Sequence, residues 1–185
     1  MNGPPANGSA LFSLKAFATN DVWAVGYKDY DYNQNTSSTF TLHWDGTAWS
    51  EIPSPNVIDT GSLRGVDGAA PNDVWAVGGT NLGGLAMHWD GAVWTVVPMP
   101  TAGFFAVTVL SSNNAIAVGG GLDGAPASAR WDGTQWSVVP TPPVFENAGS
   151  LWGVSSRDGS TWAVGFQGFF SHRTSGYDLI FNWTR

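Results

Sequence analysis

Cysteine is absent from the 185 residues, so the chain can form no disulfide bond, thiolate metal site or cysteine nucleophile. Charge is also scarce. Only 11% of the residues are charged, and seven basic residues, which form no cluster, stand against fourteen acidic ones. A net charge of -7 without a basic tract excludes a surface that follows nucleic-acid phosphates. We therefore expect no nucleic-acid partner.

Long hydrophobic runs are missing too. No stretch reaches the roughly 18 apolar residues that a membrane-spanning helix needs, so we expect no such helix. The first ten residues, MNGPPANGSA, lack the basic start and apolar stretch of a signal peptide, and we treat 1–10 as an N-terminal segment before a single domain at 11–185. Eleven Trp, 24 Gly and 11 Pro are typical of stacked short strands at the cell exterior. We expect a secreted, cell-surface or periplasmic protein.

Three short segments recur along the chain and define a repeat. An apolar segment that ends in glycine occurs at 21–26, 73–78, 115–119 and 161–165. A turn with the letters Trp-Asp-Gly and a second tryptophan occurs at 43–49, 88–94 and 130–136. A third segment precedes each apolar one, at 11–14, 63–66, 104–107 and 151–154. The second tryptophans of the turns are 45 and 42 residues apart, which is the period of a four-stranded propeller blade.

Each repeat supplies four strands. Helical repeats of this period are excluded, because the units consist of β-branched and aromatic residues punctuated by Gly and Pro. The Asp-Gly pair predicts a hairpin between the third and fourth strands. The second strand is apolar on both faces, as expected where neighbouring blades cover it. The sequence therefore predicts an all-β fold, a β-propeller of four tandem four-stranded antiparallel blades at about 11–57, 62–100, 103–142 and 150–185.

The fourth repeat lacks the Trp-Asp-Gly turn. We assign its third strand to 169–172, its turn to Ser175 and Gly176, and its fourth strand to 179–183. Because every blade is apolar on both sides, open outer faces on the end blades would leave a large exposed patch. We expect either a closed four-bladed monomer or a homo-oligomer in which two chains complete an eight-bladed ring. We favour the second, because four blades demand strongly wedge-shaped packing.

The letters Asn-Asp-Val-Trp-Ala-Val-Gly, followed by Leu-His-Trp-Asp-Gly-Thr-Ala-Trp-Ser, resemble the tandem repeats of exported bacterial β-propeller proteins. They are more distantly similar to Asp-box (BNR-type) propellers, which include sialidases and photosystem-assembly propellers. The resemblance implies the architecture, but a fold alone does not give a function. Three classes stay open: a non-catalytic extracellular module that binds or assembles with protein or glycan, an Asp-box-type glycoside hydrolase, and a purely structural array protein.

A glycoside hydrolase needs two carboxylates that converge on one spot. The turn aspartates Asp45, Asp90 and Asp132 instead occupy one equivalent place on separate repeats, so we interpret them as turn formers. The resemblance to sialidases would also require an arginine cluster and a tyrosine supported by a glutamate, whereas the arginines are scattered and only Glu51 and Glu146 exist. Known nucleophile, zinc and phosphate motifs are absent. We therefore predict no enzyme.

One position of the first strand varies while its neighbours repeat. It holds Phe12, Arg64, Phe105 and Trp152, near the axis where propellers commonly bind ligands. If these side chains point into the axial channel, three aromatic rings and one guanidinium form a stacking site for a sugar or a peptide. The alternative is that they pack between blades. The tryptophans that repeat from blade to blade are interpreted as core residues.

The loop after Gly26 is longer than its counterparts in the other repeats. Its alternating acidic and amide residues resemble the first half of a calcium loop: Asp29, Asp31, Asn33 and Asn35. Gln34 and Phe40 replace the glycine and glutamate of that pattern, so a solvated insertion is the favoured interpretation and calcium the alternative cofactor. The three tyrosines of this loop, Tyr27, Tyr30 and Tyr32, are typical of binding loops.

All three histidines share one place in the repeat, at His43, His88 and His172, with Arg130 as the fourth member. Residues that are equivalent on separate blades diverge radially, so a metal site is not favoured. We predict instead a hydrogen bond from each to a carbonyl of the neighbouring blade.

Overall fold

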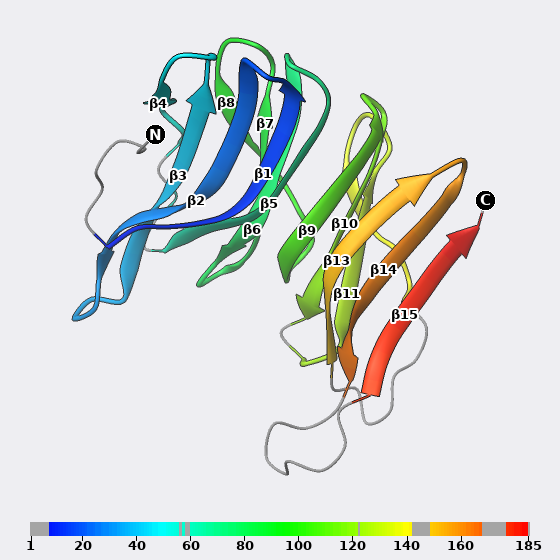
Figure 1. Cartoon of the computed structure of the whole chain (residues 1–185). Coiled ribbons are helices and arrows are strands. Elements are labelled where there is room, and N and C mark those ends of the chain that lie inside the picture. The colour runs from blue at the N-terminus through cyan, green and yellow to red at the C-terminus, as the bar shows by residue number, and fades with distance from the viewer. Residues whose placement is uncertain are drawn as a thin grey trace.

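The computed structural model describes residues 8–55, 57, 60–121, 123–141, 149–167 and 177–184. Within these residues every regular element is a β-strand, and the strands form four antiparallel sheets that follow one another along the chain (Figure 1). The all-β prediction is therefore confirmed. No helix in the described part of the chain is long and apolar enough to cross a membrane.

Each sheet is one blade. Blade 1 contains β1 (Ala10–Ala18), β2 (Asp21–Asp31), β3 (Thr36–Trp44) and β4 (Trp49–Glu51). Blade 2 contains β5 (Gly61–Ala70), β6 (Asp73–Thr80), β7 (Gly83–Trp89) and β8 (Trp94–Val97). Blade 3 contains β9 (Ala102–Ser111), β10 (Asn114–Gly121), β11 (Pro126–Trp131) and β12 (Trp136–Val138). Blade 4 contains β13 (Gly149–Arg157), β14 (Ser160–Gln167) and β15 (Tyr177–Thr184). Strands pair in sequence order in every blade.

The first strands β1, β5, β9 and β13 pack against one another and form the inner side of the molecule. Close packing there requires small residues, as the repeat indicates. A Cβ on Gly65 would lie only 2.8 Å from the Cα of Ala106 in the next blade. A β-bulge follows Leu63 on β5, and a Cβ on the paired Gly78 would lie 1.9 Å from the carbonyl oxygen of Ser62. The glycine that ends each apolar segment is therefore required by this bulge.

The Asp-Gly turn closes the outer hairpin of blades 1 to 3. In blade 1 the Asp45 carboxylate accepts hydrogen bonds from the backbone N–H groups of Thr47 and Ala48, at 2.8 and 2.9 Å. Gly46 follows with a φ of 95°, in the left-handed region that glycine tolerates. Asp90 and Asp132 repeat this geometry. The prediction that these aspartates form turns is confirmed.

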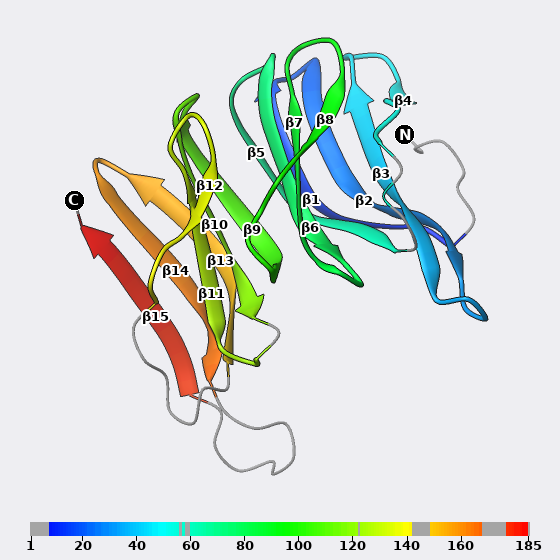
Figure 2. The same ribbon diagram turned by 180° about the vertical axis from the view of Figure 1, so that it is seen from behind.

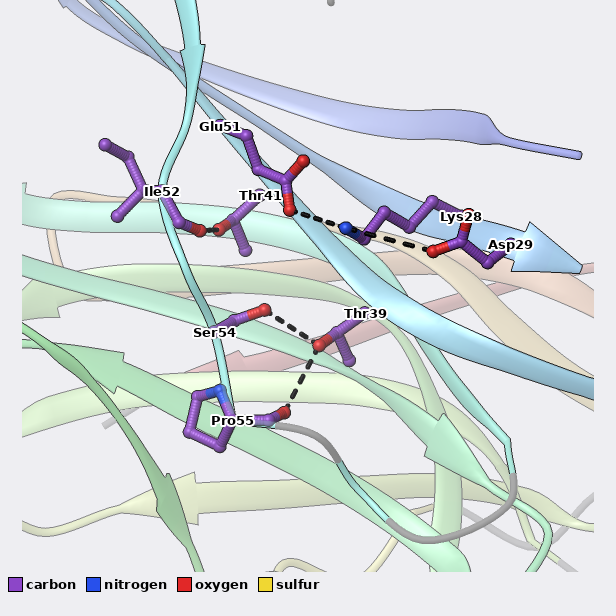
Figure 3. Close-up of polar contacts among 8 residues, drawn as sticks. All are labelled: Lys28, Asp29, Thr39, Thr41, Glu51, Ile52, Ser54 and Pro55. Carbon is purple, nitrogen blue, oxygen red and sulfur yellow. Dashed lines mark hydrogen bonds and ion pairs between the residues drawn. The ribbon is translucent and has the colours of Figure 1, made fainter. Parts of the chain in front are cut away.

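The chain that leaves β4 is tied back to β3 by two threonines (Figure 3). The Thr41 hydroxyl donates to the carbonyl oxygen of Ile52. The Thr39 hydroxyl lies 2.8 Å from the Ser54 hydroxyl and 3.3 Å from the carbonyl oxygen of Pro55. Ser128 takes the place of Thr41 in blade 3 and donates to the carbonyl of Val139. These bonds hold the connection to the following blade against the outer strands.

Blade 4 departs from the predicted strand assignment. Residues 179–183 belong to β15, which pairs directly with β14, so they form the third strand of the blade and not the fourth. In this register Trp183 lies opposite Thr161, just as Trp44 lies opposite Val22 in blade 1. Trp183 therefore occupies the third-strand tryptophan position. The residues first assigned to the third strand and the turn, 169–172 and Ser175 with Gly176, lie outside the described residues.

The core lies between the blades, where tryptophans interlock. The ring of Trp23 on β2 lies 5.0 and 5.2 Å from the rings of Trp89 and Trp94 in blade 2. The ring of Trp75 on β6 has the same relation to Trp131 and Trp136 in blade 3, at 4.7 and 5.2 Å. Edge-to-face and tilted contacts of this kind stabilise beyond the area they bury. The core role predicted for the repeated tryptophans is confirmed at these two interfaces.

The four blades form an open arc. Blade 1 and blade 4 lie at opposite ends of it in both views (Figures 1 and 2), and the described strands of these two blades do not pack against each other. The closed four-bladed monomer is thus not the form that the chain takes. The four blades share three interfaces, and the rotations at these interfaces leave the ring open.

Candidate functional site

The four residues of the variable first-strand position lie together on the inner side of the arc. Phe12, Arg64, Phe105 and Trp152 come from β1, β5, β9 and β13, and they line one cavity of about 370 Å³. We call these residues the axial cluster. The Arg64 guanidinium lies over the Phe12 ring, 4.2 Å from its centroid, and the Phe105 and Trp152 rings are 5.9 Å apart. The arrangement contains one cation and three aromatic faces.

Aromatic contacts extend the axial cluster toward both ends of the arc. On blade 1, Tyr27 lies 5.8 Å from Phe12 and 5.9 Å from Tyr30. On blade 4, Phe166 lies 6.1 Å from Trp152. The structure thus connects Tyr30 to the axial cluster through Tyr27, while Tyr32 is 85% exposed at the tip of the loop. Tyr27 is one of the three loop tyrosines whose composition is typical of binding loops, and it is the one that contacts Phe12 directly.

Trp152 is the most exposed ring of the axial cluster, at 62%. Its indole N–H donates to the Ser150 hydroxyl at 2.6 Å, which fixes the plane of the ring while leaving a face open. A large ring held in one orientation loses little entropy when a ligand stacks on it. Among the described residues, Arg64 is the one charged side chain that lines the cavity. Its exposed head group is therefore available to an anionic group next to these rings.

The loop with the four candidate calcium ligands is the turn of the β2–β3 hairpin. The Asp31 carboxylate accepts hydrogen bonds from the backbone N–H groups of Asn33 and Gln34, at 2.8 and 3.3 Å. The Asn35 side-chain oxygen accepts one from the Tyr30 hydroxyl at 3.0 Å. These oxygens support the turn itself. Among the described residues no group of three or more His, Cys, Asp or Glu could hold a metal ion, and the calcium site stays a prediction.

Lys28 forms ion pairs with two carboxylates at the base of this loop (Figure 3). Its ammonium group lies 2.7 Å from the Glu51 carboxylate on β4 and 3.8 Å from the Asp29 carboxylate. The hydrogen bond to Glu51 is the main cause that raises the pKa of Lys28 above its usual value, against the opposing effect of burial. Glu51 is therefore occupied by an ion pair that joins β2 to β4.

The histidines make a different contact from the predicted one. The His43 Nε2 atom lies 2.8 Å from the carboxylate of Asp21, at the start of β2 in the same blade, and His88 has the same distance to Asp73. Arg130 donates to the Asn114 side chain at 3.1 Å in blade 3. The predicted bond to a neighbouring blade is wrong, because the antiparallel register places the end of the third strand beside the start of the second. His172 lies outside the described residues.

The turn aspartates are exposed, and each satisfies the N–H groups of its own turn. The Thr47 hydroxyl, followed by the backbone N–H groups of Ala48 and Thr47, lowers the pKa of Asp45 to about 2. The pKa values of Asp90 and Asp132 are lowered by the same kind of hydrogen bonds. Such carboxylates are stabilised in the charged form and engaged with the backbone, which makes them poor proton donors and nucleophiles.

No family profile and no curated protein matches this sequence. Solved structures do match. A structure of YCF48 bound to D1 peptide superposes with a TM-score of 0.57 at 16% identity, over 96% of this chain and 55% of that chain. The fold is a β-propeller. The tricorn protease gives a TM-score of 0.57 at 12% identity, over all of this chain and 17% of that one.

A third propeller match is the Aleuria aurantia lectin, an N224Q mutant in complex with alpha-methyl-L-fucoside. It superposes with a TM-score of 0.52 at 13% identity, over 98% of this chain and 66% of the lectin chain. At these identities the likeness concerns the fold alone. This chain also spans only about half of the YCF48 chain and a smaller part of the protease. The function must therefore be argued from the site.

Proposed function

We propose that this propeller is a non-catalytic binding module that takes a peptide segment on its axial cluster, and that the segment presents an apolar side chain next to a carboxylate. The observation that carries the proposal is the convergence of Phe12, Phe105, Trp152 and Arg64 around one cavity of about 370 Å³. Ligand sites combine apolar walls with a few placed polar groups, and cavities of this size are common among them. A structural neighbour solved with a bound peptide supports a peptide ligand.

The chemistry of the lining favours a peptide over a neutral sugar. A sugar ring offers many hydroxyl groups, and its recognition needs several side chains that donate and accept hydrogen bonds. The axial cluster offers aromatic faces and a single guanidinium, which is a donor only. An aspartate, a glutamate or a free carboxyl terminus satisfies that guanidinium with a charge-assisted hydrogen bond. The adjacent rings then cover an apolar side chain.

A glycan is the second candidate, and the fixed, largely exposed ring of Trp152 favours it. Such a ring can stack on the apolar face of a sugar. The match to a lectin in complex with a fucoside agrees with this alternative. A glycan array and a peptide array probed with the same labelled chain separate the two ligand classes.

The contacts of the turn aspartates and of Glu51 argue against the hydrolase alternative. The turn aspartates are tied to their own turns, and Glu51 is paired with Lys28. Glu146 lies outside the described residues, so Glu146→Gln tests the alternative directly. Hydrolysis of fluorogenic glycosides that disappears in Glu146→Gln would replace a binding function by a catalytic one.

We further propose that the protein acts outside the cytoplasm, among the exported bacterial repeat propellers that its sequence resembles. Its tryptophan-rich, glycine-rich and cysteine-free composition supports this placement. Fractionation of the producing cells tests it: protein recovered only from the cytoplasm would contradict the proposal.

The binding test uses peptides selected from an array, each prepared with a free and with an amidated carboxyl terminus. Arg64→Gln should weaken binding of the anionic form by about tenfold or more, since a hydrogen bond to a charged group contributes about 1.5–3 kcal/mol. Arg157→Gln is the matched control. Arg157 is an exposed arginine on blade 4 that pairs only with the neighbouring Asp158 among the described residues. Equal effects of the two substitutions would contradict the proposed role of the axial cluster.

A further inference from the structure

Every blade presents two different faces to its neighbours. The forward face carries a large residue and a valine from the second strand, and the rear face of the next blade receives them. Trp23 and Val25 of blade 1 pack in this way into blade 2. Trp75 and Val77 of blade 2 pack into blade 3. The forward and rear faces are therefore complementary, and the same fit recurs along the arc.

The forward face of blade 4 has the same residues but no neighbour. Trp162 and Val164 occupy the positions of Trp23 and Val25, as the strand pairings show. Trp23 and Val25 are 2% and 0% exposed, whereas Trp162 and Val164 are 54% and 51% exposed. Ile180 on β15 lies opposite Val164 and is exposed as well. Blade 4 thus ends in an uncovered apolar face built for a following blade.

The rear face of blade 1 is uncovered in the corresponding way. Leu11 and Leu14 on β1 are 49% and 66% exposed, while the equivalent Leu63 and Val66 on β5 are 0% and 6% exposed beneath blade 1. A groove of about 450 Å³ opens here. It is lined by Leu11, Phe12, Ser13, Leu14, Ala24, Leu42 and Trp49.

The residues that line the groove occupy the same positions in blade 1 as the residues of blade 2 that receive a forward face within the chain. In blade 2 that surface contains Leu63, Val66, Ala76, Met87 and Trp94, and Trp23 of blade 1 packs on it. The blade 1 groove has Leu11, Leu14, Ala24, Leu42 and Trp49 at the same places. The rings of Trp44 and Trp49 also lie 5.8 Å apart at 46°, as those of Trp89 and Trp94 do. A tryptophan on a forward face is the residue that this pair receives.

Charge does not oppose such a contact. No described residue that lines the groove is charged. Lys15 on the same strand is turned to the other side of the blade, where its ammonium group lies 2.6 Å from the carboxylate of Asp67 in blade 2. Trp162, Val164 and Ile180 of blade 4 are likewise uncharged. Burial of both apolar faces removes two patches that a soluble monomer avoids.

We infer that a second copy of this chain covers both faces, with Trp162 and Val164 of each copy seated in the Leu11–Leu14 groove of the other. The two contacts are identical and continue the blade-to-blade packing already present within the chain, and together they close an eight-bladed ring. A head-to-tail contact that closes after two copies gives a finite assembly. The axial clusters of the two copies then face each other, so the second copy completes the channel with its own Phe12, Arg64, Phe105 and Trp152.

One-sided variants test this pairing. Trp162→Asp spoils only the forward face and Leu14→Asp only the rear face, and both residues are exposed in the single chain, so folding is retained. Circular dichroism spectra of both variants, and of a milder Trp162→Ser variant, check that the fold is retained. Leu82→Asp is the control, because Leu82 is an exposed leucine in the turn between β6 and β7, away from both faces. Masses are measured by analytical ultracentrifugation.

We expect Trp162→Asp and Leu14→Asp each to sediment at the 19.6 kDa chain mass, and the Leu82→Asp control at twice that mass. An equimolar mixture of the two one-sided variants should recover pairs, because one intact forward face still meets one intact rear face. A variant that stays paired alone would indicate a contact between like faces and overturn the inference. A mixture that stays monomeric, or an unmodified chain that grows beyond two copies, would also overturn it.

Discussion

Trp75 provides the clearest measure of how much the interlocked tryptophans stabilise the fold. It is 1% exposed and lies between His88 of its own blade and the tryptophan pair of blade 3. A buried tryptophan removes roughly 200 Å² from water, which at about 25 cal/mol per Å² corresponds to about 5 kcal/mol. Its indole N–H is buried and has no acceptor among the described residues, which offsets part of this gain.

Trp75→Ala should therefore lower the free energy of unfolding by about 3 to 5 kcal/mol, the range found when large core side chains are truncated. Trp75→Phe should cost less, because it keeps most of the ring and removes the unpaired donor. The assay is urea denaturation followed by far-UV circular dichroism, at one protein concentration for all variants because any pairing would add to the stability.

Trp152→Ala is the matched control for this experiment, because Trp152 is a largely exposed tryptophan on the inner side of the arc. Its loss should cost under about 1 kcal/mol, as exposed positions usually do. If Trp75→Ala also cost under about 1 kcal/mol, the second strand would be exposed in solution, and the blade packing described above would be refuted.

Three further predictions concern the turns, the loop and one pocket between blades 3 and 4. The pKa of Asp45 is lowered from 3.8 to about 2. Its contribution to stability is therefore complete above about pH 4 and is lost as the pH falls through about 2. Asp45→Asn should remove this part of the pH dependence of the free energy of unfolding. Asp29→Ala with Asp31→Ala should leave the fold intact, and a melting temperature of the parent chain that rises with calcium would establish the calcium site instead. Ile116 of blade 3 stands where blades 1 and 2 have the forward-face tryptophan, and it lines a cavity of about 190 Å³. Ile116→Trp should therefore raise the free energy of unfolding by about 1 kcal/mol. A lower free energy of unfolding in urea would show that the cavity cannot accept the ring.

The repeat was sufficient to predict the blades, because each one is a local unit whose turn and glycine positions are written in the sequence. The repeat also predicted that the residues of the axial cluster lie close together, because equivalent residues of the first strands meet near the axis. Arg64 and Phe12 are in fact in contact.

Other features depended on information that is not local. The order of strands in blade 4 was predicted wrongly, because its degenerate letters allow two registers and only the pairing of β15 with β14 selects one. The partner of His43 was missed although Asp21 and Asp73 accompany His43 and His88 in the first two repeats. Ring closure is the sum of small rotations between blades, and no residue pattern reports that sum.

The proposed pairing requires that one chain forms half of a ring and that its two end faces are complementary. The most direct test is the mass of the unmodified chain by light scattering over a dilution series. The expected mass is twice the 19.6 kDa chain mass, and it falls to the single-chain mass only on dilution. A chain that stays at 19.6 kDa at every concentration, with Trp162 exposed to solvent, would contradict it.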